Sequence, residues 1–301
     1  MSKLGFIING KNGRKQRFDK EFRMVADQLQ DYTVDIQVTK STGDATHMAR
    51  QMADAGFTHI IAVGGDGTLN ETINGIKKSA HPRCSVGMLF YGTANDFAKT
   101  ISPPKSLPLL IEAIKKDRSK RLDLGLIEQK IGDLYFKRYF INIADLGIGA
   151  QVVKKVNESR NLFGADFTFF SAIIRTFFDY SNQPVTCETE DWQWEGRINS
   201  LVIANGKYFG SGLCIAPQAD PTDGKFAIVI TGDITIKDYL KNLTDIRKGR
   251  VLDHPKVTYR SAQKLRITSP SLECLIEADG ELVGGLPVVI SIEKGAINFI
   301  I

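Results

Sequence analysis

The chain has 301 residues, of which 43% are hydrophobic and 24% are charged, and its formal net charge is +5. This length suggests two domains, and the composition excludes the fibrous, coiled-coil and disordered classes. The weak positive charge does not by itself indicate nucleic acid, but it suits an anionic nucleotide or transient contact with an anionic membrane surface. No run approaches the ~20 apolar residues of a membrane span, and the N-terminal run is too short for a signal peptide. We therefore expect a cytoplasmic protein.

The cysteines and histidines indicate neither a disulfide framework nor a zinc site. The four cysteines are far apart and show no CxxC spacing, and no histidine has a partner at ligand spacing. We expect the cysteines to be reduced and to lie in the core.

The first third of the chain alternates strand and helix patterns. Short apolar or alternating runs predict strands at 3–9, 33–39, 58–63 and 86–90. Apolar residues at helical spacing predict helices at 18–29, 47–55, from the glycine turn after the third strand to about 78, and at 107–116. This order predicts an α/β domain with a parallel sheet, whose ligand lies beyond the carboxyl ends of the strands.

The pattern changes after about Arg121. Strands are predicted at 122–127, 134–143, 184–189, 192–197, 200–204, 226–231, 256–259, 264–269 and 287–292. Only two helices are expected among them, at 162–178 and 236–248. We therefore expect a mainly antiparallel β-sandwich over 123–294, preceded by an α/β domain over 1–122 that also takes the C-terminal strand 295–301.

The clearest motif is the glycine-rich turn Gly64–Thr68 (GGDGT), which follows a buried strand and opens a helix. Glycines allow the backbone to approach a ligand, and the positive end of the helix attracts a phosphate. A purely structural alternative makes Thr68 a helix cap, with Glu71 three residues later in a capping box. That alternative does not explain an aspartate between glycines, so we predict phosphate binding.

Two other glycine-containing segments do not fit known phosphate motifs. The run 10–15 lacks the spacing of GxxxxGK[ST], and Gly147–Val152 has valine where a dinucleotide fingerprint needs its third glycine. We interpret the second segment as a turn at the end of a strand.

The loop Tyr91–Lys99 (YGTANDFAK) directly follows the fourth predicted strand. In a parallel sheet it emerges at the same edge as the glycine turn, so Asp66 and Asp96 can face one site. Two carboxylates beside a triphosphate suit Mg²⁺, which prefers hard oxygen ligands. The alternative is that Asn95 and Asp96 merely cap a helix.

Together, GGDGTLNE and GTANDFAK resemble the diacylglycerol kinase catalytic-domain family, and specifically its small bacterial lipid kinases of YegS type. The resemblance extends over nearly the whole chain. It includes Asp123-Leu124-Gly125, Ala216-Pro217 and Asp279-Gly280-Glu281. The chain departs from the common family pattern at Gly10, Tyr91 and Lys99, which affects loop geometry and substrate detail.

The resemblance implies a two-domain kinase with an interdomain cleft, which uses ATP and Mg²⁺ to phosphorylate a lipid in phospholipid metabolism. The residues matched to the nucleotide site are Asn9, Thr39, Gly64, Gly65, Asp66, Gly67, Thr68, Asn70, Glu71, Thr93, Asn95 and Asp96.

The resemblance also implies a Mg²⁺ site in the second domain, at the turn Asp220–Lys225. Asp223 would supply its side chain, and Asp220 and Lys225 their backbone carbonyls. From the residues alone this segment is only a turn. Asp279 is implied as the base that takes the proton of the lipid hydroxyl, with Glu281 in support, although Asp-Gly is also a common hairpin turn. Asp123 would help to organise metal and water.

The aromatic segment 163–180 contains Phe167, Phe170, Ile174, Phe177 and Phe178 on overlapping helix faces. Core packing is the simpler interpretation, and an apolar wall for a lipid or a membrane surface is the alternative.

Two other functions stay open. One is a kinase of a soluble substrate, as in NAD kinases, and the other is a non-catalytic nucleotide or lipid sensor. The partners we expect are a lipid substrate and an anionic membrane surface but no nucleic acid, and a homodimer is left open.

Overall fold

The computed structural model describes residues 2–11, 13–158 and 165–301, with side chains outside 157–170. The chain divides into two compact units. The first runs to Leu122 and includes Gly295–Ile301, and the second is Asp123–Lys294. Strands β5 (Ser119–Ile131) and β18 (Val288–Ile300) cross the boundary along the chain.

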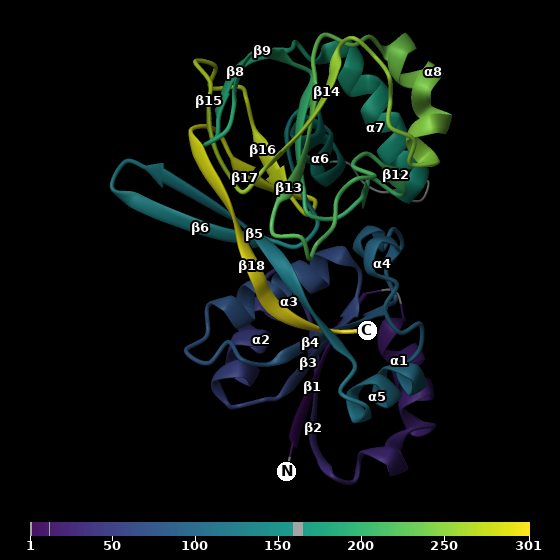
Figure 1. Ribbon diagram of the computed structural model, residues 1–301. Coiled ribbons are helices and arrows are strands. Elements are labelled where there is room, and N and C mark those ends of the chain that lie inside the picture. The colour runs from purple at the N-terminus through teal and green to yellow at the C-terminus, as the bar shows by residue number, and fades with distance from the viewer. Residues whose placement is uncertain (1, 12, 159–164) are drawn as a thin grey trace. The chain divides into compact units, whose positions relative to one another are not determined.

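The first unit is a parallel sheet in the order β2-β1-β3-β4, which the end of β18 extends beside β4. Side chains of α1 and α5 pack on one face of the sheet, and α2 and α3 lie on the other (Figure 1). The elements are β1 Ser2–Asn9, α1 Arg14–Arg23, a 3₁₀ turn Ala26–Leu29, β2 Tyr32–Thr39, α2 Asp44–Asp54, β3 His59–Gly64, α3 Asp66–Lys77, β4 Ser85–Phe90, α4 Asp96–Ile101 and α5 Leu107–Lys115. The predicted parallel α/β domain is confirmed.

The second unit is an antiparallel β-sandwich. One sheet has the order β14-β13-β10-β7-β16-β17, and the other contains β5, β6, β8, β9, β15 and the first part of β18. The core between them holds Phe140, Leu201, Phe226, Leu265 and Ile290, all fully buried. The remaining elements are β6 Leu134–Phe140, β7 Ile143–Gly147, α6 Ile148–Glu158, α7 Ala165–Asp179, β8 Gln183–Glu188, β9 Gln193–Ile198, β10 Ser200–Ala204, β11 Tyr208–Phe209, β12 Leu213–Cys214, β13 Phe226–Thr231, α8 Ile236–Arg247, β14 Val257–Ala262, β15 Lys264–Thr268, β16 Ile276–Ala278 and β17 Glu281–Gly284.

Several elements differ from the prediction. The helix predicted over 18–29 ends at Arg23 and continues as a separate 3₁₀ turn, and the strand predicted over 134–143 is two strands, β6 and β7. Helix α6 was missed, and it begins where we predicted only a turn at Gly147–Val152. The short helix α4 and the short strands β11, β12, β16 and β17 were also not predicted. Gly147 has φ +98°, a left-handed conformation that glycine adopts without strain, and it turns the chain from β7 directly into that helix.

The cysteines agree with the prediction, since all four are free thiols and buried. Burial raises the pKa of the Cys84 thiol to about 12, so this group is unreactive at neutral pH. No helix in the described part of the chain is both long enough and apolar enough to cross a membrane.

Candidate active site

In the first unit, the predicted nucleotide residues lie at the carboxyl ends of neighbouring strands. Asn9 is in register with Thr39 across β1 and β2, and Gly64 is in register with Phe90 across β3 and β4. The Asn9 side chain donates to the hydroxyl of Thr68 at 3.3 Å, which ties the end of β1 to the glycine turn. This edge of a parallel sheet is where α/β proteins bind nucleotides.

The two predicted loops meet by direct backbone approach. A Cβ atom added to Gly92 would lie 2.5 Å from the Cα of Gly65, and one added to Gly64 would overlap the Thr68 side chain. Gly67 differs, because a Cβ there would meet nothing within 4 Å. Gly64 and Gly92 are thus needed for packing, whereas Gly67 leaves open space above the start of α3.

Asp66 connects the two loops through its carboxylate. Its oxygens accept the backbone N–H groups of Asp96 at 2.9 Å and Phe97 at 3.1 Å, at the start of α4. Burial, with a smaller contribution from the negative charge of Asp96, raises the pKa of Asp66. The Asp96 carboxylate itself lies 2.7 Å from the Lys99 ammonium. The structure brings both aspartates together, but each is engaged by protein groups.

The capping box that we considered for Thr68 and Glu71 is wrong. Helix α3 already begins at Asp66, so Thr68 lies inside its first turn. The Glu71 carboxylate instead accepts the backbone N–H of Ala45 at 3.2 Å, in the first turn of α2. Glu71 therefore joins two helices on one side of the sheet.

The other predicted nucleotide residues have different environments. Asn95 has φ +49° and donates from its side chain to the Gly92 carbonyl at 2.8 Å, which supports the left-handed turn. Asn70 is buried in α3, and Thr93 is exposed on the second loop.

Sequence reasoning missed Arg14 at this edge. Its guanidinium donates to the side-chain oxygen of Asn9 and, at 2.9 Å, to the carbonyl of Tyr91, so it spans the ends of β1 and β4. Partial burial lowers the pKa of Arg14, yet an arginine stays protonated. A fixed cation at this edge suits phosphate oxygens. The available signal was an arginine just after the NGKNG turn that follows the first strand.

In the second unit, Asp279 occupies the turn between β16 and β17. It has φ +50°, and its carboxylate accepts three backbone N–H groups, those of Ile141 at 2.9 Å and of Asn142 and Ile143 at 3.0 Å. These donors fix the orientation of the carboxylate. Positive φ at both Asp279 and Gly280 (+83°) is the usual geometry of a two-residue Asp-Gly hairpin turn, so the three backbone donors, and not backbone strain, distinguish this carboxylate.

Two acidic side chains, Glu277 and Glu281, lie on either side of this turn. Glu281 forms an ion pair with Arg138 at 2.6 Å. The Glu277 carboxylate accepts the N–H of Gly280 at 2.9 Å and so closes the turn behind Asp279. Burial, and then the nearby charge of Asp145, raise the pKa of Glu277 well above its usual range.

Asp145 lies directly opposite Glu277 across β7 and β16, and sequence reasoning did not single it out. It is 1% exposed, and burial raises its pKa to about 7. The Ser200 hydroxyl donates to it at 2.6 Å, and a side chain on Gly149 would overlap its carboxylate. A buried aspartate in an otherwise apolar strand was the signal that we overlooked.

The predicted metal turn contains oxygen donors of the kind that Mg²⁺ prefers. The Asp123 carboxylate accepts the Gly224 N–H at 2.7 Å, and the Asp223 carboxylate accepts the Lys225 N–H at 3.1 Å. The Asp220 carboxylate instead accepts the Thr222 hydroxyl at 2.7 Å. The described residues contain no cluster of three metal-binding side chains. A cation here would therefore depend on Asp223, backbone carbonyls and water.

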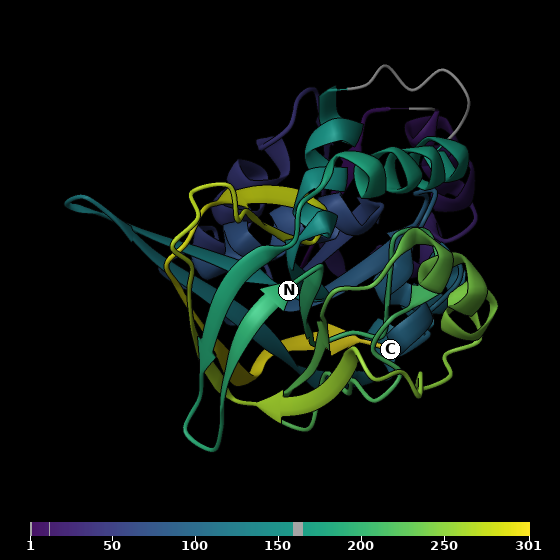
Figure 2. The same ribbon diagram turned by 90° about the horizontal axis from the view of Figure 1, so that it is seen from above.

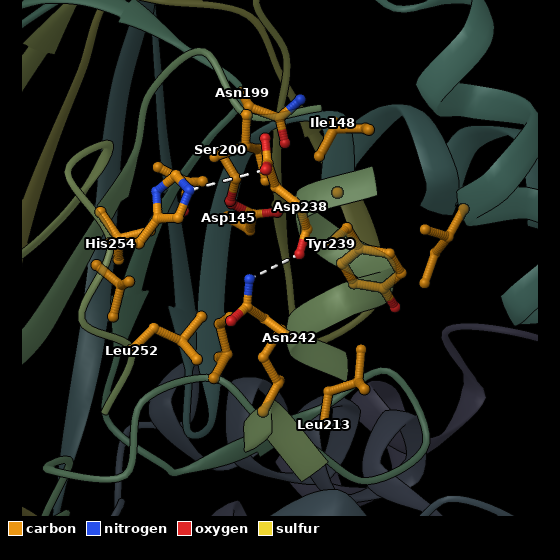
Figure 3. Close-up of a pocket in the computed structure, with 18 of the residues that line it drawn as sticks. Asp145, Ile148, Asn199, Ser200, Leu213, Asp238, Tyr239, Asn242, Leu252 and His254 are labelled. Carbon is orange, nitrogen blue, oxygen red and sulfur yellow. Dashed lines mark hydrogen bonds and ion pairs between the residues drawn. The ribbon is translucent and has the colours of Figure 1, made fainter. Parts of the chain in front are cut away.

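An apolar pocket lies on the outer face of the six-stranded sheet, among α6, α7 and α8 (Figure 3). The space inside it that a water molecule can reach is about 110 Å³, and the volume rises to about 910 Å³ when the open solvent at its mouth is counted. Asp145 and Ser200 lie on its sheet side, and Asp238 lies 3.9 Å from His254 on another wall. The buried hydroxyl of Tyr239 has no hydrogen-bond partner among the described residues. The pocket therefore suits a largely apolar ligand that carries some polar group.

The aromatic helix has mixed surroundings. Ile173 and Phe177 line this pocket, whereas the side chain of Phe178 is 75% exposed. Phe167 and Phe170 lie outside the residues whose side chains are described. Core packing accounts for part of the helix, because Ile173 and Phe177 also pack against the apolar cluster of Ile148, Val152 and Ala172.

Comparisons with known proteins agree with this architecture. Residues 3–127 match the diacylglycerol kinase catalytic domain, and residues 142–301 match the YegS C-terminal NAD kinase beta sandwich-like domain. A diacylglycerol kinase of Staphylococcus carnosus is 26% identical over 95% of this chain and 91% of its own length. A probable lipid kinase YegS-like of Pseudomonas putida is 31% identical, over 72% of this chain and 70% of its own.

Solved structures show the same fold. A putative diacylglycerol kinase from Bacillus anthracis covers 99% of this chain and 96% of its own, with a TM-score of 0.77 and 21% identity. Yeast NADH kinase covers 99% of this chain and 82% of its own, with a TM-score of 0.52 and 10% identity, which is a distant likeness of fold. Together with the two domain matches, these relatives show that the chain belongs to the diacylglycerol kinase and YegS-like lipid kinase family.

Proposed function

We propose that this protein is an ATP-dependent lipid kinase, which transfers the γ-phosphoryl group of ATP to the hydroxyl of diacylglycerol, phosphatidylglycerol or a similar lipid. Membership of a kinase family supports phosphoryl transfer. The observation that carries the lipid substrate is the apolar pocket in the second unit. Its wall residue Asp145 faces Glu277, which in turn closes the Asp279 turn, so pocket and proposed base are linked through two strands.

In the proposed reaction, the lipid oxygen attacks the γ-phosphorus, the bond to the β-phosphate oxygen breaks, and ADP leaves. Asp279 accepts the hydroxyl proton, the role that an aspartate plays in protein kinases. Its three backbone donors keep the carboxylate aligned without a costly rearrangement. Glu277 acts as a positioning residue, because it fixes the turn and need not touch the substrate.

On the nucleotide side, the backbone at Gly65–Thr68 and the N-terminus of α3 are proposed to bind phosphate oxygens, and the Arg14 guanidinium to neutralise part of their charge. Mg²⁺, when bound, would supply further positive charge toward phosphate. For the turn 220–225 the proposed ligands are the Asp223 side chain and the carbonyls of Asp220 and Lys225.

The test is phosphoryl transfer from labelled ATP to a panel of acceptors, namely diacylglycerol, phosphatidylglycerol, sphingosine, ceramide and NAD. We expect a labelled lipid. Labelled NAD alone would favour a soluble-substrate kinase of the kind suggested by the distant likeness to yeast NADH kinase, and ATP binding without any labelled product would indicate a sensor.

A second assay tests the pocket. Ile173→Trp places a large ring in the cavity, so long-chain lipids should lose turnover by ~10-fold or more while ATP binding is kept. Leu240→Trp is the matched control, because Leu240 lies on α8 but is 47% exposed and does not line the cavity. Equal turnover of both variants would remove the pocket from the substrate path.

A further inference from the structure

The hairpin of β5 and β6 carries a cluster of exposed apolar side chains at its turn. Ile131 is 53% exposed, Leu134 64%, Tyr135 59% and Phe136 48%, all within six residues. We call residues 130–137 the β5–β6 tip. In both ribbon views the tip projects well beyond the neighbouring strands of the second unit (Figure 1 and Figure 2). Exposed apolar side chains that gather in this way indicate an interaction surface.

The pairing register sorts the tip into two faces. Ile131 is paired with Leu134, so these two side chains lie on one face, and Phe136 follows Leu134 on that same face. Lys130 is paired with Tyr135 on the opposite face. The tip therefore has an apolar face and a face that combines an aromatic ring with a cation.

Lys137 adds a second cation to that opposite face. Its ammonium lies 2.9 Å from Glu128 and 5.7 Å from the centre of the Tyr135 ring. Lysine stems can lie along apolar surface while their ammonium groups reach outward, and tyrosine is enriched where apolar and wet regions meet. This combination matches the boundary between the acyl chains and the headgroups of a bilayer.

A second hairpin in the same unit gives an internal contrast. The turn between β8 and β9 exposes the acidic residues Glu188, Glu190 and Asp191 and no large apolar side chain. The β5–β6 tip carries two lysines against one acidic residue, Asp133, so an anionic surface would attract it weakly and would repel the β8–β9 turn. Charge thus distinguishes two hairpins of similar construction.

The size of the tip argues against a second copy of the chain as its partner. Four half-exposed side chains offer on the order of 300–400 Å² of apolar surface, well below the ~800 Å² per partner of a stable protein interface. A bilayer needs no such area, because it surrounds each inserted side chain.

We propose that the β5–β6 tip inserts Ile131, Leu134 and Phe136 into the acyl-chain boundary of an anionic bilayer, with Lys130 and Lys137 at the headgroups. The inference rests on the proposed lipid kinase function only for the reason why the tip would insert, since a kinase must reach a substrate that is held in a bilayer. Insertion itself can be measured without any turnover.

The direct test uses an environment-sensitive fluorophore on Leu134→Cys in the full chain, since the four native cysteines are buried. Vesicles of phosphatidylcholine with phosphatidylglycerol should shift its emission to the blue, and lipids brominated on the acyl chain should quench it. The same label on Glu190→Cys, in the β8–β9 turn, is the matched control and should not change. An unchanged spectrum at residue 134, or an equal change at 190, overturns the proposal.

A second measurement uses unlabelled protein. Leu134→Ser with Phe136→Ser should lower partition to these vesicles by ~10-fold or more, because both apolar side chains are lost from the bilayer. Lys130→Gln should lower it less, and the loss should shrink as salt rises. If the serine variant binds vesicles as the native chain does, or only converts a dimer to a monomer in sedimentation, the tip is not a membrane contact.

The outcome is separable from the kinase proposal. The serine variant should phosphorylate a water-soluble short-chain lipid at the native rate and lose activity only on vesicles. A chain that inserts but phosphorylates no acceptor disproves the kinase function alone, and an active kinase without insertion disproves the tip alone.

Discussion

The candidate functional residues of the two units are positioned by different means. In the first unit the site is mostly backbone, where glycines bring Gly64–Thr68 against the following loop at one sheet edge. In the second unit the site is mostly side chains, contributed by strands and helices far apart in the sequence and gathered around Asp145 and the Asp279 turn. A site formed by backbone can therefore be predicted from a short sequence motif. A site formed by side chains from distant segments can be identified only when the pairing of the strands is known.

The largest effect should come from the side-chain site. Asp279→Asn removes the proposed proton acceptor and turns an amide toward backbone donors, so turnover should fall by ~10²–10⁴. ATP affinity, measured by calorimetry, should change little because the nucleotide residues belong to the first unit. Asp191→Asn, on an exposed turn, is the control. Near-normal turnover would move the base elsewhere, with Glu281 the next residue to test.

A single added methyl group should disrupt the glycine-rich site of the first unit. Gly92→Ala places a Cβ 2.5 Å from Gly65, which should cost about 1–3 kcal/mol of unfolding free energy and weaken ATP binding. Gly67→Ala adds the same methyl group where nothing lies within 4 Å, so denaturant unfolding should show almost no loss of stability. Similar losses in both variants would mean that the loops do not pack as described.

A larger side chain at the open position sharpens this contrast. Gly67→Val should leave the fold intact but reduce ATP affinity, because the branched side chain would fill the space proposed for phosphate. Unchanged affinity by calorimetry would remove the phosphate role of the turn.

A pH titration tests the buried acids of the second unit. The folded state holds the Asp145 proton up to about pH 7, whereas an unfolded aspartate releases its proton near pH 4. The folded state thus binds more protons between these values, and the unfolding free energy should decrease as pH rises through this window. Asp145→Asn should flatten that decrease by about 1–2 kcal/mol between pH 5 and 7, as measured by urea unfolding. The slope that Glu277 contributes would persist, so an identical slope in both proteins would contradict the assignment to Asp145.

The smallest effect concerns the residue that sequence reasoning missed at the backbone site. Arg14→Ala should weaken ATP binding by about tenfold, since one charge-assisted contact to phosphate is lost. Lys20→Ala, exposed on the same helix, should leave the affinity unchanged. If both variants bind ATP equally, Arg14 only joins the ends of β1 and β4.

The parallel sheet and the sandwich could be predicted because their periodicity is local. The first three strands of the parallel sheet lie within a residue of their predicted positions for that reason. Helix α6 was missed because Ile148–Glu158 is rich in β-branched residues and has glycine as its second residue, and neither favours a helix. Asp145 and Arg14 were missed for another reason, since their roles depend on contacts with Ser200 and Tyr91 from other parts of the chain.

Strand β18 has a consequence for how the protein is made. It is the last element of the chain, yet its residues 288–291 pair with β15 and its later residues pair with β4. During translation both units therefore wait for the same segment to leave the ribosome before their sheets are complete, although domains commonly fold as they emerge. Until then the edge of β4 is uncovered, and an uncovered strand edge invites pairing with another nascent chain.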